Sequence, residues 1–278
     1  MPVMERDMPK VIDDFVRMCS DGYRLGFNEA NGGNASYRMT EEETDICKNE
    51  LGFDRKSPLV KMNTEVKALA GEYFITTGAG RLMRNVELDP EGSLGIVQID
   101  EAGSSYRILW GLKDAGPTSE FETHLLSHCV RKEASHGQDR VMYHLHPESL
   151  IAMTYISPLE DEFFSRAIWR SMTEAVMVIP EGIGVLKWLV PGSSDLARMT
   201  CKKLEDYRAV VWAHHGLFVT GSSFDDAFGR AHTIEKSASI YMKILSSGRE
   251  ILQDISDDSL KKICDKLGLK INEELLNG

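Results

Sequence analysis

The chain has 278 residues, enough for one large domain or two small ones with a substantial core. Apolar residues make up 42% of the chain and charged residues 27%, a composition typical of globular proteins and not of disordered ones. The formal net charge of −11 argues against nucleic acid or an anionic membrane as a partner. An anionic substrate would therefore need a local positive site built from a metal ion, an arginine or clustered backbone amides.

The cysteines are odd in number, scattered and without a Cys-x-x-Cys pair. This pattern predicts a reducing cytoplasm, with neither a disulfide framework nor a cysteine-bound zinc ion. They are Cys19, Cys47, Cys129, Cys201 and Cys264. The first residues are charged and lack the apolar segment of a signal peptide, so none is predicted. No apolar run approaches the roughly 18 residues that a membrane-spanning helix needs.

A helix is expected over residues 9–27, where apolar side chains recur at helical spacing. It is followed by Asn31-Gly32-Gly33-Asn34 and then by a short strand at 37–39. The two glycines permit positive φ angles, so consecutive N–H groups can point into one concavity and bind an anion. A plain turn between helix and strand is the alternative. The acidic residues 40–57 are expected to form an irregular surface excursion.

A second glycine-bearing turn follows the strand expected at 73–76. Its residues, Thr77-Gly78-Ala79-Gly80-Arg81, add a hydroxyl and a cation, and Arg84 lies three positions on. Because a phosphate needs several N–H donors together with a cation or a hydroxyl, two such turns favour a phosphate site more than either alone. The Gly-Lys-Ser/Thr end of a Walker A loop and a dinucleotide fingerprint are both missing.

Ser119 and Glu122 have the spacing of a capping box, which predicts a helix from there to about Glu133 with Glu120 in its first turn. The helix dipole favours a carboxylate at that position, so stability alone can explain Glu120. The functional alternative makes Glu120 a general base at the mouth of a site.

The same helix carries His124 and His128, whose spacing of four residues can also hold a metal ion. Both share a helical face with the apolar side chains of Phe121, Leu125 and Cys129. We therefore expect them to be core histidines, or histidines that support a site, and not metal ligands.

A stronger metal signal comes from His144 and His146, which follow each other at strand spacing at the end of a short apolar run. Alternation along a strand places both side chains on one face. Two imidazoles do not hold a catalytic metal securely, and the best source of a third is His214-His215-Gly216, at the end of another apolar run. Three nitrogen ligands leave a position for substrate. For the first pair alone, two buried and hydrogen-bonded histidines are the alternative.

The remaining elements alternate between helices and strands without a linker or an internal repeat, so one α/β domain is expected. Strands are expected at 94–100, 106–110, 176–179, 209–215 and 216–220. Helices are expected at 147–155, 160–172, 193–205 and 223–248, with a short amphipathic helix within 256–276.

Together these motifs resemble the class II aldolase and adducin family. The segments that carry the resemblance are 31–34, 77–81 with 84–85, 94–97, 108–112, 117–120, 144–146, 190–192 and 214–216. They keep the order of the family and spread over most of the chain. The resemblance implies a single domain over 1–278: an α/β fold with a central, mostly antiparallel β-sheet flanked by helices in three layers.

The resemblance also implies roles for individual residues. His144, His146 and His215 match the ligands of one zinc ion per subunit, with His215 chosen over His214 because the ligand directly precedes the glycine. Glu120 matches the catalytic base. The positions that match the substrate and phosphate loops are Asn31, Gly32, Asn34, Thr77, Gly78, Ala79, Gly80, Thr118 and Ser119. Glu174 is a candidate for moving the proton on the aldehyde side, across an interface of the homotetramer that family members form.

The activity implied by the resemblance is the reversible cleavage of a phosphorylated ketose by a zinc-dependent lyase of the cytoplasm. No Schiff-base lysine is needed, and none stands within the motifs. The alternatives within the family are another phosphoketose aldolase, a phosphoketose epimerase with the same metal site, and a non-catalytic structural protein. One departure is visible, because Ala79 stands where the resembling enzymes have a serine, and a hydroxyl is lost.

Overall fold

The computed structural model describes residues 8–276, and the chain divides into two compact units that meet between residues 129 and 130, inside helix α4 (Phe121–Ala134). The first seven residues, on which the prediction of no signal peptide rests, lie outside the described part. Among the described residues, no helix is both long and apolar enough to cross a membrane.

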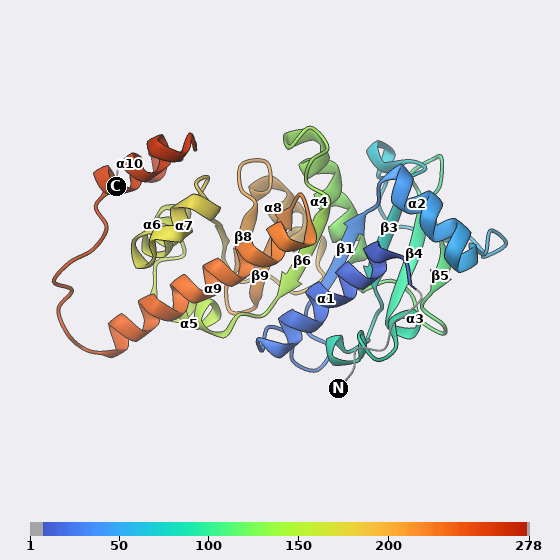
Figure 1. Ribbon diagram of the computed structural model, residues 1–278, viewed down its shortest axis with the longest axis horizontal. Coiled ribbons are helices and arrows are strands. Elements are labelled where there is room, and N and C mark those ends of the chain that lie inside the picture. The colour runs from blue at the N-terminus through green and yellow to red at the C-terminus, as the bar shows by residue number, and fades with distance from the viewer. Residues whose placement is uncertain (1–7, 277–278) are drawn as a thin grey trace. The chain divides into compact units, whose positions relative to one another are not determined.

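The first unit is built on an antiparallel sheet with the strand order β2-β5-β4-β3-β1. Its strands are β1 (Asn34–Arg38), β2 (Val60–Lys61), β3 (Tyr73–Thr77), β4 (Leu94–Ile99) and β5 (Ser105–Gly111). Its helices are α1 (Lys10–Arg24), α2 (Glu41–Cys47) and α3 (Pro90–Ser93), with a π-helical turn at Lys48–Gly52 and 3-10 turns at Lys67–Leu69 and Met83–Asn85 (Figure 1). The predicted first helix and the hairpin of β4 and β5 are confirmed.

The core of the first unit lies between its sheet and α4. Phe74 and Val97 from the sheet pack with Phe121 and Leu125 from the helix, and all four are buried. The β4–β5 turn requires Gly103, because its φ is 69° and a Cβ there would lie 2.8 Å from the backbone nitrogen of Lys67. Burial of these side chains holds the amino-terminal end of α4 against the sheet.

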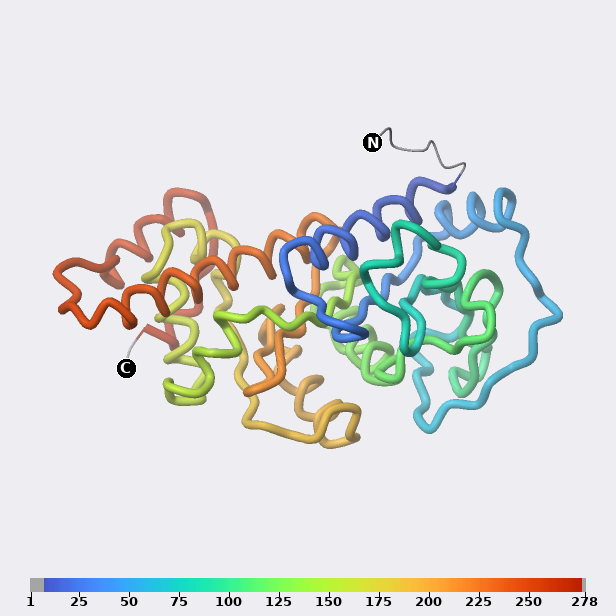
Figure 2. Tube along the Cα trace, turned by 90° about the horizontal axis from the view of Figure 1, so that it is seen from below, coloured from blue at the N-terminus to red at the C-terminus, as the bar shows by residue number. Residues whose placement is uncertain are grey.

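The prediction of an irregular excursion over residues 40–57 is wrong at its start. Thr40 and Glu43 form a capping box, in which each side chain accepts a hydrogen bond from the backbone amide of the other, and α2 begins there. Only after the π-helical turn does the chain follow a wide path to β2 (Figure 2). The Thr-x-x-Glu spacing is visible in the sequence and could have located this helix.

The second unit has the strand order β6-β9-β8-β7, in which β7 and β8 are parallel and the other pairs antiparallel. Its strands are β6 (Val141–Leu145), β7 (Gly184–Leu186), β8 (Ala209–Trp212) and β9 (Gly216–Gly221). Its helices are α5 (Glu148–Ile156), α6 (Asp161–Ser171), α7 (Thr173–Val178), α8 (Ser194–Lys203), α9 (Phe224–Ser246) and α10 (Asp257–Leu267), followed by a 3-10 turn at Glu273–Leu276. The helices predicted at 193–205 and 223–248 are confirmed as α8 and α9, and their N-caps are Ser193 and Ser223.

The long helix α9 organises the helical part of this unit, since it packs against α5, α6 and α7 (Figure 1). Its Glu235 accepts hydrogen bonds from the backbone amides of Ser149 and Leu150, both at 3.0 Å, in the first turn of α5. A carboxylate at a helix amino terminus satisfies amides that have no partner within the helix. This contact fixes the chain directly after His146.

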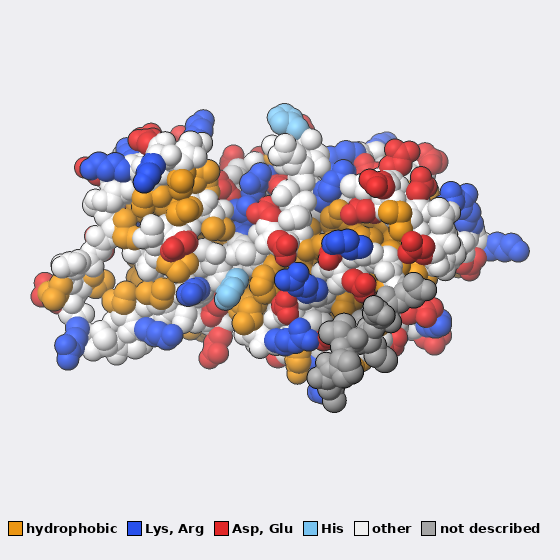
Figure 3. All heavy atoms as spheres, viewed as in Figure 1, with side chains coloured by type: hydrophobic (Ala, Val, Ile, Leu, Met, Phe, Trp, Pro, Cys, Tyr) orange, Lys and Arg blue, Asp and Glu red, His pale blue; other side chains and the backbone are white. Residues whose placement is uncertain are grey.

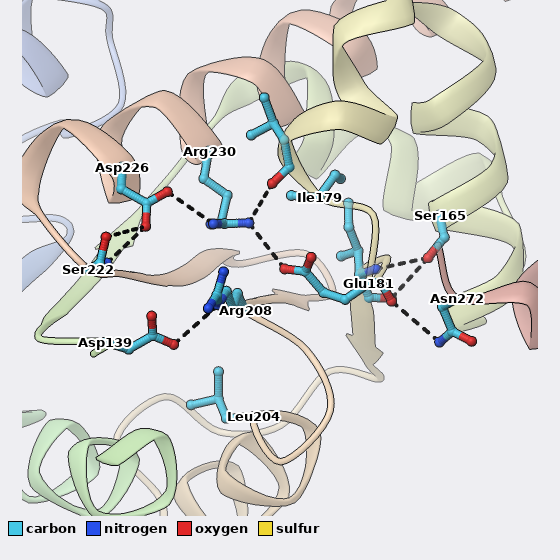
Figure 4. Close-up of polar contacts among 12 residues, drawn as sticks. Asp139, Ser165, Ile179, Glu181, Leu204, Arg208, Ser222, Asp226, Arg230 and Asn272 are labelled. Carbon is cyan, nitrogen blue, oxygen red and sulfur yellow. Dashed lines mark hydrogen bonds and ion pairs between the residues drawn. The ribbon is translucent and has the colours of Figure 1, made fainter. Parts of the chain in front are cut away.

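A buried ionic network ties α9 to the segment before β7 (Figure 4). The Arg230 guanidinium is 3% exposed and donates to Glu181, Asp226 and the carbonyl of Val178 at 2.7–3.1 Å. Burial raises the pKa of Glu181, and Arg230 opposes that rise. For Asp226 burial also acts to raise the pKa, but Arg230 and two hydrogen bonds from Ser222 outweigh it, and the pKa falls below its ordinary value.

The strand predicted at residues 176–179 does not form, because residues 176–178 are the end of helix α7. Ala175 and Val176 in the helix and Ile179 directly after it are buried, a spacing that follows a helical turn and not the alternation of a strand. A run of four apolar residues cannot distinguish the two, and contact with α6 and α9 decides for the helix.

Helices combined with mostly antiparallel strands in both units confirm the predicted α/β class. A single domain over the whole chain stays a prediction.

Candidate active site

Three histidines of the second unit converge as the sequence predicts. His144 and His146 lie at the end of β6, and His215 lies in the turn between β8 and β9. Among the described residues they form the one group of histidine, cysteine and carboxylate side chains whose ligand atoms all lie within 4.8 Å of one another. The Nδ1 of His144 lies 3.0 Å from the carbonyl oxygen of Leu217, to which it donates, so its Nε2 carries the lone pair.

The spacing of these nitrogens fits a metal ion. The Nε2 of His144 lies 3.2 Å from that of His146 and 3.3 Å from that of His215. Ligands placed tetrahedrally at the roughly 2.0–2.1 Å of a zinc–imidazole bond are separated by about 3.3–3.4 Å. A cation at the centre would also remove the repulsion between lone pairs that face each other. The triad could thus hold one metal ion.

The third histidine, His215, is presented by a tight turn. Trp212 pairs with Gly216 across the β8–β9 hairpin, and His214 adopts a left-handed conformation with a φ of 61°. Gly216 has no side chain because a Cβ would lie 2.4 Å from the carbonyl oxygen of Leu145 and within 3.0 Å of the first two ligand rings. The glycine of the His-His-Gly motif therefore lets β6 approach the turn.

His214 does not belong to this group of converging histidines. It is exposed, its ring lies 4.1 Å from that of Tyr155, and its Nδ1 lies 3.1 Å from the Thr154 hydroxyl. The choice of His215 over its neighbour agrees with the converging nitrogens.

Beneath the triad lies a side chain that the sequence reasoning missed. The indole of Trp212 contacts the rings of His144 and His215, with centroids 4.5 and 5.2 Å away, and stacks on Phe218. Its Nε1 donates to the hydroxyl of Thr200 at 2.9 Å. An aromatic residue in the apolar run just before the histidines was the available signal.

Glu120 lies in the first unit, at the entry to α4. Its side chain is buried, and its Oε2 accepts a 2.7 Å hydrogen bond from the Nδ2 of Asn34 on β1. The predicted capping box does not form, because α4 begins at Phe121 and Glu122 instead accepts two 3.0 Å hydrogen bonds from Asn63. Glu120 is therefore a buried residue directly before α4 and not a solvent-exposed carboxylate in the first turn of the helix.

His124 and His128 are fully buried, as predicted for core histidines. Both contact the hydroxyl of Ser36, at 2.8 and 2.9 Å. Burial lowers the pKa of His124 to about 3, so the ring is neutral at ordinary pH.

Both glycine turns of the first unit contain backbone amides that are already hydrogen-bonded. In the first turn, the amide of Gly32 donates to the carbonyl of Glu29 at 2.6 Å. The amides of Gly78 and Ala79 already donate to the carbonyls of Ser93 and Gly116, each at 2.9 Å, so they line the turn without serving as donors. A Cβ on Gly78 would lie 2.4 Å from the Leu112 side chain, which explains the glycine. Gly80 has a φ of 67° and open space around it.

The other predicted phosphate residues lie around the same strand ends. The amide of Thr118 donates to the carbonyl of Thr77 at 2.8 Å, which brings the 117–120 motif beside the second glycine turn. The Thr77 hydroxyl lies 3.2 Å from the amide of Ala35, next to Asn34. Three further positions, Asn31, Gly32 and Ser119, lie at least partly open to solvent. These loops are thus neighbours within the first unit.

Glu174 is exposed in the first turn of α7 and not at the start of a strand. Among the described residues, no hydrogen bond or ion pair restrains its carboxylate. It lies in the second unit, as the histidines do.

The sequence of this chain matches a known protein family. Residues 13–242 match the family described as the class II aldolase and adducin N-terminal domain, so the chain belongs to that family. It is a class II aldolase, a lyase, and its histidine triad could bind the metal ion on which such enzymes depend.

Several individual proteins are similar to this chain in sequence or in structure. The chain is 39% identical over 259 residues to the rhamnulose-1-phosphate aldolase of Mannheimia succiniciproducens, covering 93% of this chain and 94% of the relative. A sugar-phosphate aldolase from Thermotoga maritima has a similar structure, with a TM-score of 0.74 and 28% identity over 87% of this chain and 97% of that one. L-fuculose-1-phosphate aldolase from Thermus thermophilus is similar in fold alone, with a TM-score of 0.57 and 18% identity over 87% and 99%.

Proposed function

We propose that this protein reversibly cleaves L-rhamnulose 1-phosphate to dihydroxyacetone phosphate and L-lactaldehyde, a step in the breakdown of rhamnose. The observation that carries the proposal is the 39% identity, over nearly the full length of both chains, to rhamnulose-1-phosphate aldolases. The segments at 88–90 and 108–112, which resemble the rhamnulose branch of the family, support the same substrate.

The proposed metal ligands are His144, His146 and His215. A zinc ion held there would supply a Lewis acid that polarises the ketose carbonyl and stabilises negative charge on the oxygen. Neutral imidazoles leave the full charge of the ion available, and the hydrogen bond from His144 to Leu217 sets the nitrogen that faces it. Imidazole suits several divalent metals, and zinc is the ion we propose.

Glu120 is the proposed base. Cleavage breaks the C3–C4 bond of the ketose, so C3 must gain a proton when dihydroxyacetone phosphate forms. Glu120 returns that proton in the cleavage direction and removes it in the synthetic direction. Its burial and its hydrogen bond from Asn34 support this role over that of a surface helix cap.

The phosphate group is proposed to bind to the loops of the first unit. We assign it to Asn31, Thr77, Gly80, Thr118 and Ser119. Gly32, Gly78 and Ala79, whose amides donate to backbone carbonyls, shape the turns, and Asn34 lies between this loop and Glu120. Clustered amides and hydroxyls can hold a dianion in a chain whose net charge is −11. A phosphate fixed there orients the reacting carbons.

Glu174 is proposed to move the proton of the C4 hydroxyl, which must leave as the aldehyde forms. Because its carboxylate is exposed, it is accessible to a second subunit, and a homotetramer with interfacial sites is part of the proposal. Glu174→Gln should lower kcat for cleavage while leaving exchange of the dihydroxyacetone phosphate C3 proton intact, because exchange does not involve the aldehyde. An unchanged cleavage rate of this variant would reject the role of Glu174 in proton transfer. Light scattering of the purified protein would test whether it is a tetramer.

The working compartment is proposed to be the cytoplasm. All five cysteines lie among the described residues and are free thiols, which suits a reducing environment. On the face seen in Figure 3, acidic and basic side chains are interspersed, an arrangement that suits a small-molecule substrate more than a polyanion.

The test of the function is cleavage of L-rhamnulose 1-phosphate, coupled to enzymatic reduction of dihydroxyacetone phosphate, before and after chelation and with zinc added back. We expect activity that chelation abolishes and zinc restores. L-Fuculose 1-phosphate and L-ribulose 5-phosphate are assayed in parallel, because the fold is shared with an L-fuculose-1-phosphate aldolase. Preference for either one would reject the rhamnulose assignment, and cleavage that persists after the metal content has fallen to zero would reject the metal role.

A further inference from the structure

A stripe of polar residues on α4 faces a matching pair on β1. Glu120, His124 and His128 follow one another at intervals of four residues, and the amide of His124 donates to the carbonyl of Glu120 at 3.0 Å, so the helical repeat already includes Glu120. Asn34 and Ser36 are two residues apart on a strand and therefore share a face. The side chains of the helix and of the strand contact each other in the core of the first unit.

The five side chains form one continuous hydrogen-bonded series, here called the support chain. Its contacts run from Glu120 Oε2 to Asn34 Nδ2 at 2.7 Å and from Asn34 Oδ1 to His124 Nε2 at 2.5 Å. They continue from His124 Nδ1 to Ser36 Oγ at 2.8 Å and from Ser36 Oγ to His128 Nε2 at 2.9 Å. Each side chain is at most 8% exposed, so an unsatisfied member would be costly.

An ionised Glu120, which the proposed role of base requires, gives this series a single direction. An ionised carboxylate can only accept, so Asn34 must present its NH2 group to Glu120 and its carbonyl to His124. That carbonyl can only accept, so the proton of His124 is on Nε2. His124 is neutral and has one ring proton, so its Nδ1 accepts from the Ser36 hydroxyl.

The last contact follows in the same way. Ser36 has one proton, which it gives to His124, and its oxygen therefore accepts from the Nε2–H of His128. The reversed arrangement requires a proton on Glu120 Oε2. Every hydrogen in the support chain thus points toward the carboxylate as long as Glu120 is ionised.

We propose that the support chain positions the Glu120 carboxylate and holds Oε2 as a permanent acceptor, so that proton transfer with the substrate takes place at Oε1. The inference rests on the proposed function, in which Glu120 is the base. Asn34, His124, Ser36 and His128 are positioning residues in this scheme: none exchanges a proton with the substrate. The proton that C3 releases in the synthetic direction is taken by Oε1 and is returned from it in cleavage.

The direction of the support chain is tested first, without any substrate. Long-range ¹H–¹⁵N correlation spectra of the folded protein, assigned with His124→Phe and His128→Phe, report which ring nitrogen carries the proton. We expect both His124 and His128 to carry a proton on Nε2 at pH 7, with His124 neutral. A proton on Nδ1 of His124, or a cationic His124 ring, would overturn the proposal whether or not the protein cleaves the ketose.

The positioning role is tested by a matched pair of variants. His124→Gln keeps an amide NH2 near the place of Nε2–H and can still donate to Asn34, whereas His124→Phe keeps the ring volume and loses the donor. We expect kcat to fall about ten- to a hundredfold in His124→Phe with KM nearly unchanged, because outer-sphere partners of a reacting group have effects of this size. His124→Gln should recover most of that loss.

Ser36→Ala provides a second variant should His124→Phe fail to fold, as checked by its thermal unfolding. It removes the donor to His124 Nδ1, and we expect a smaller fall in kcat, again without a change in KM. Equal kcat values for wild type, His124→Phe and Ser36→Ala would overturn the positioning role. A wild-type protein that cleaves no phosphoketose would instead reject the proposed function, and the spectra would still decide the direction of the chain.

Discussion

The indole of Trp212 lies against the imidazole of His144, with ring centroids 4.5 Å apart and planes inclined by 38°. The same indole contacts His215, so one side chain restrains two of the three proposed ligands. The hydrogen bond from its Nε1 to Thr200 fixes the orientation of the indole in turn. The geometry of the triad thus depends on a residue that binds no metal.

Trp212→Phe should therefore weaken metal binding without removing it. Loss of the Thr200 hydrogen bond and of part of the ring contact lets both histidines move, and we expect the metal affinity to fall about ten- to a hundredfold. The measurement is a competition titration with a chromophoric chelator. Trp188→Phe is the matched control, because Trp188 is 56% exposed, and its affinity should equal that of wild type. Equal metal affinities for both variants would show that Trp212 is a core residue without influence on metal binding.

The neighbouring histidines of the β8–β9 turn should behave differently. His215→Asn removes one of the three converging nitrogens, and we expect near-complete loss of bound metal and a fall in kcat of at least about a hundredfold. His214→Asn should keep the metal and the activity, because asparagine accepts the left-handed φ of this position. Metal content by elemental analysis and cleavage rate are measured on both proteins. Loss of metal from the His214 variant alone would exchange the two assignments.

A second matched pair tests the base. Glu120→Gln keeps the shape of the side chain but cannot take a proton, and kcat should fall about 10²–10⁴-fold. Glu122→Gln alters a carboxylate two positions on that only accepts from Asn63, and it should change kcat by less than about twofold, since surface substitutions of this kind have small effects. Exchange of the C3 proton of dihydroxyacetone phosphate with solvent is the most direct assay. Full exchange by Glu120→Gln would remove the base role.

Much of the fold and of the site was accessible from the sequence because the strong signals were local. His144 and His146 are separated by the period of a strand, and the serine caps of α8 and α9 stand at fixed offsets from their helices. The motif at 214–216 was predicted from the sequence as the source of the third nitrogen, but the choice of His215 over His214 required the family resemblance.

What the sequence could not supply depends on tertiary contact. Residues 176–178 are helical because α7 packs against α6 and α9. Glu122 accepts hydrogen bonds from Asn63 because a distant part of the chain lies beside it. The engagement of the Gly78 and Ala79 amides by other carbonyls is equally invisible in the glycine pattern. Pairing of distant groups decides these details, and propensity does not.

The Arg230 network gives a prediction about stability and pH. Arg230→Met leaves Glu181 and Asp226 without their shared cation, and we expect a loss of about 3–5 kcal/mol in the free energy of unfolding at pH 7. Arg198→Met removes an exposed arginine and should cost less than about 1 kcal/mol. Urea denaturation of chelator-treated protein measures both.

The sign of the pH dependence follows from the two carboxyls. The pKa of Asp226 is lowered in the folded protein, so its contribution is present above its unfolded pKa and is lost as the pH falls through the folded value. The pKa of Glu181 is raised, so its ionised form costs stability as the pH rises. Removing Arg230 lowers the free energy of unfolding only while the two carboxyls are charged, because protonated carboxyls do not need a cation beside them. The difference between variant and wild type should therefore shrink as the pH approaches about 4, and a constant difference would contradict this account.

Ala79→Ser tests whether the missing hydroxyl matters to the phosphate loop. Ala79 is exposed and its amide is held by the carbonyl of Gly116, so a serine hydroxyl can be added without moving the backbone. A new hydrogen bond to a charged phosphate is worth about 1.5 kcal/mol or more, which corresponds to a KM about tenfold lower with kcat unchanged. Inhibition by inorganic phosphate should strengthen by the same factor, while turnover of unphosphorylated L-rhamnulose stays as it was. An unchanged KM together with an unchanged phosphate inhibition constant would place the phosphate away from this residue and leave Thr77, Gly80 and Thr118 as the loop that binds it.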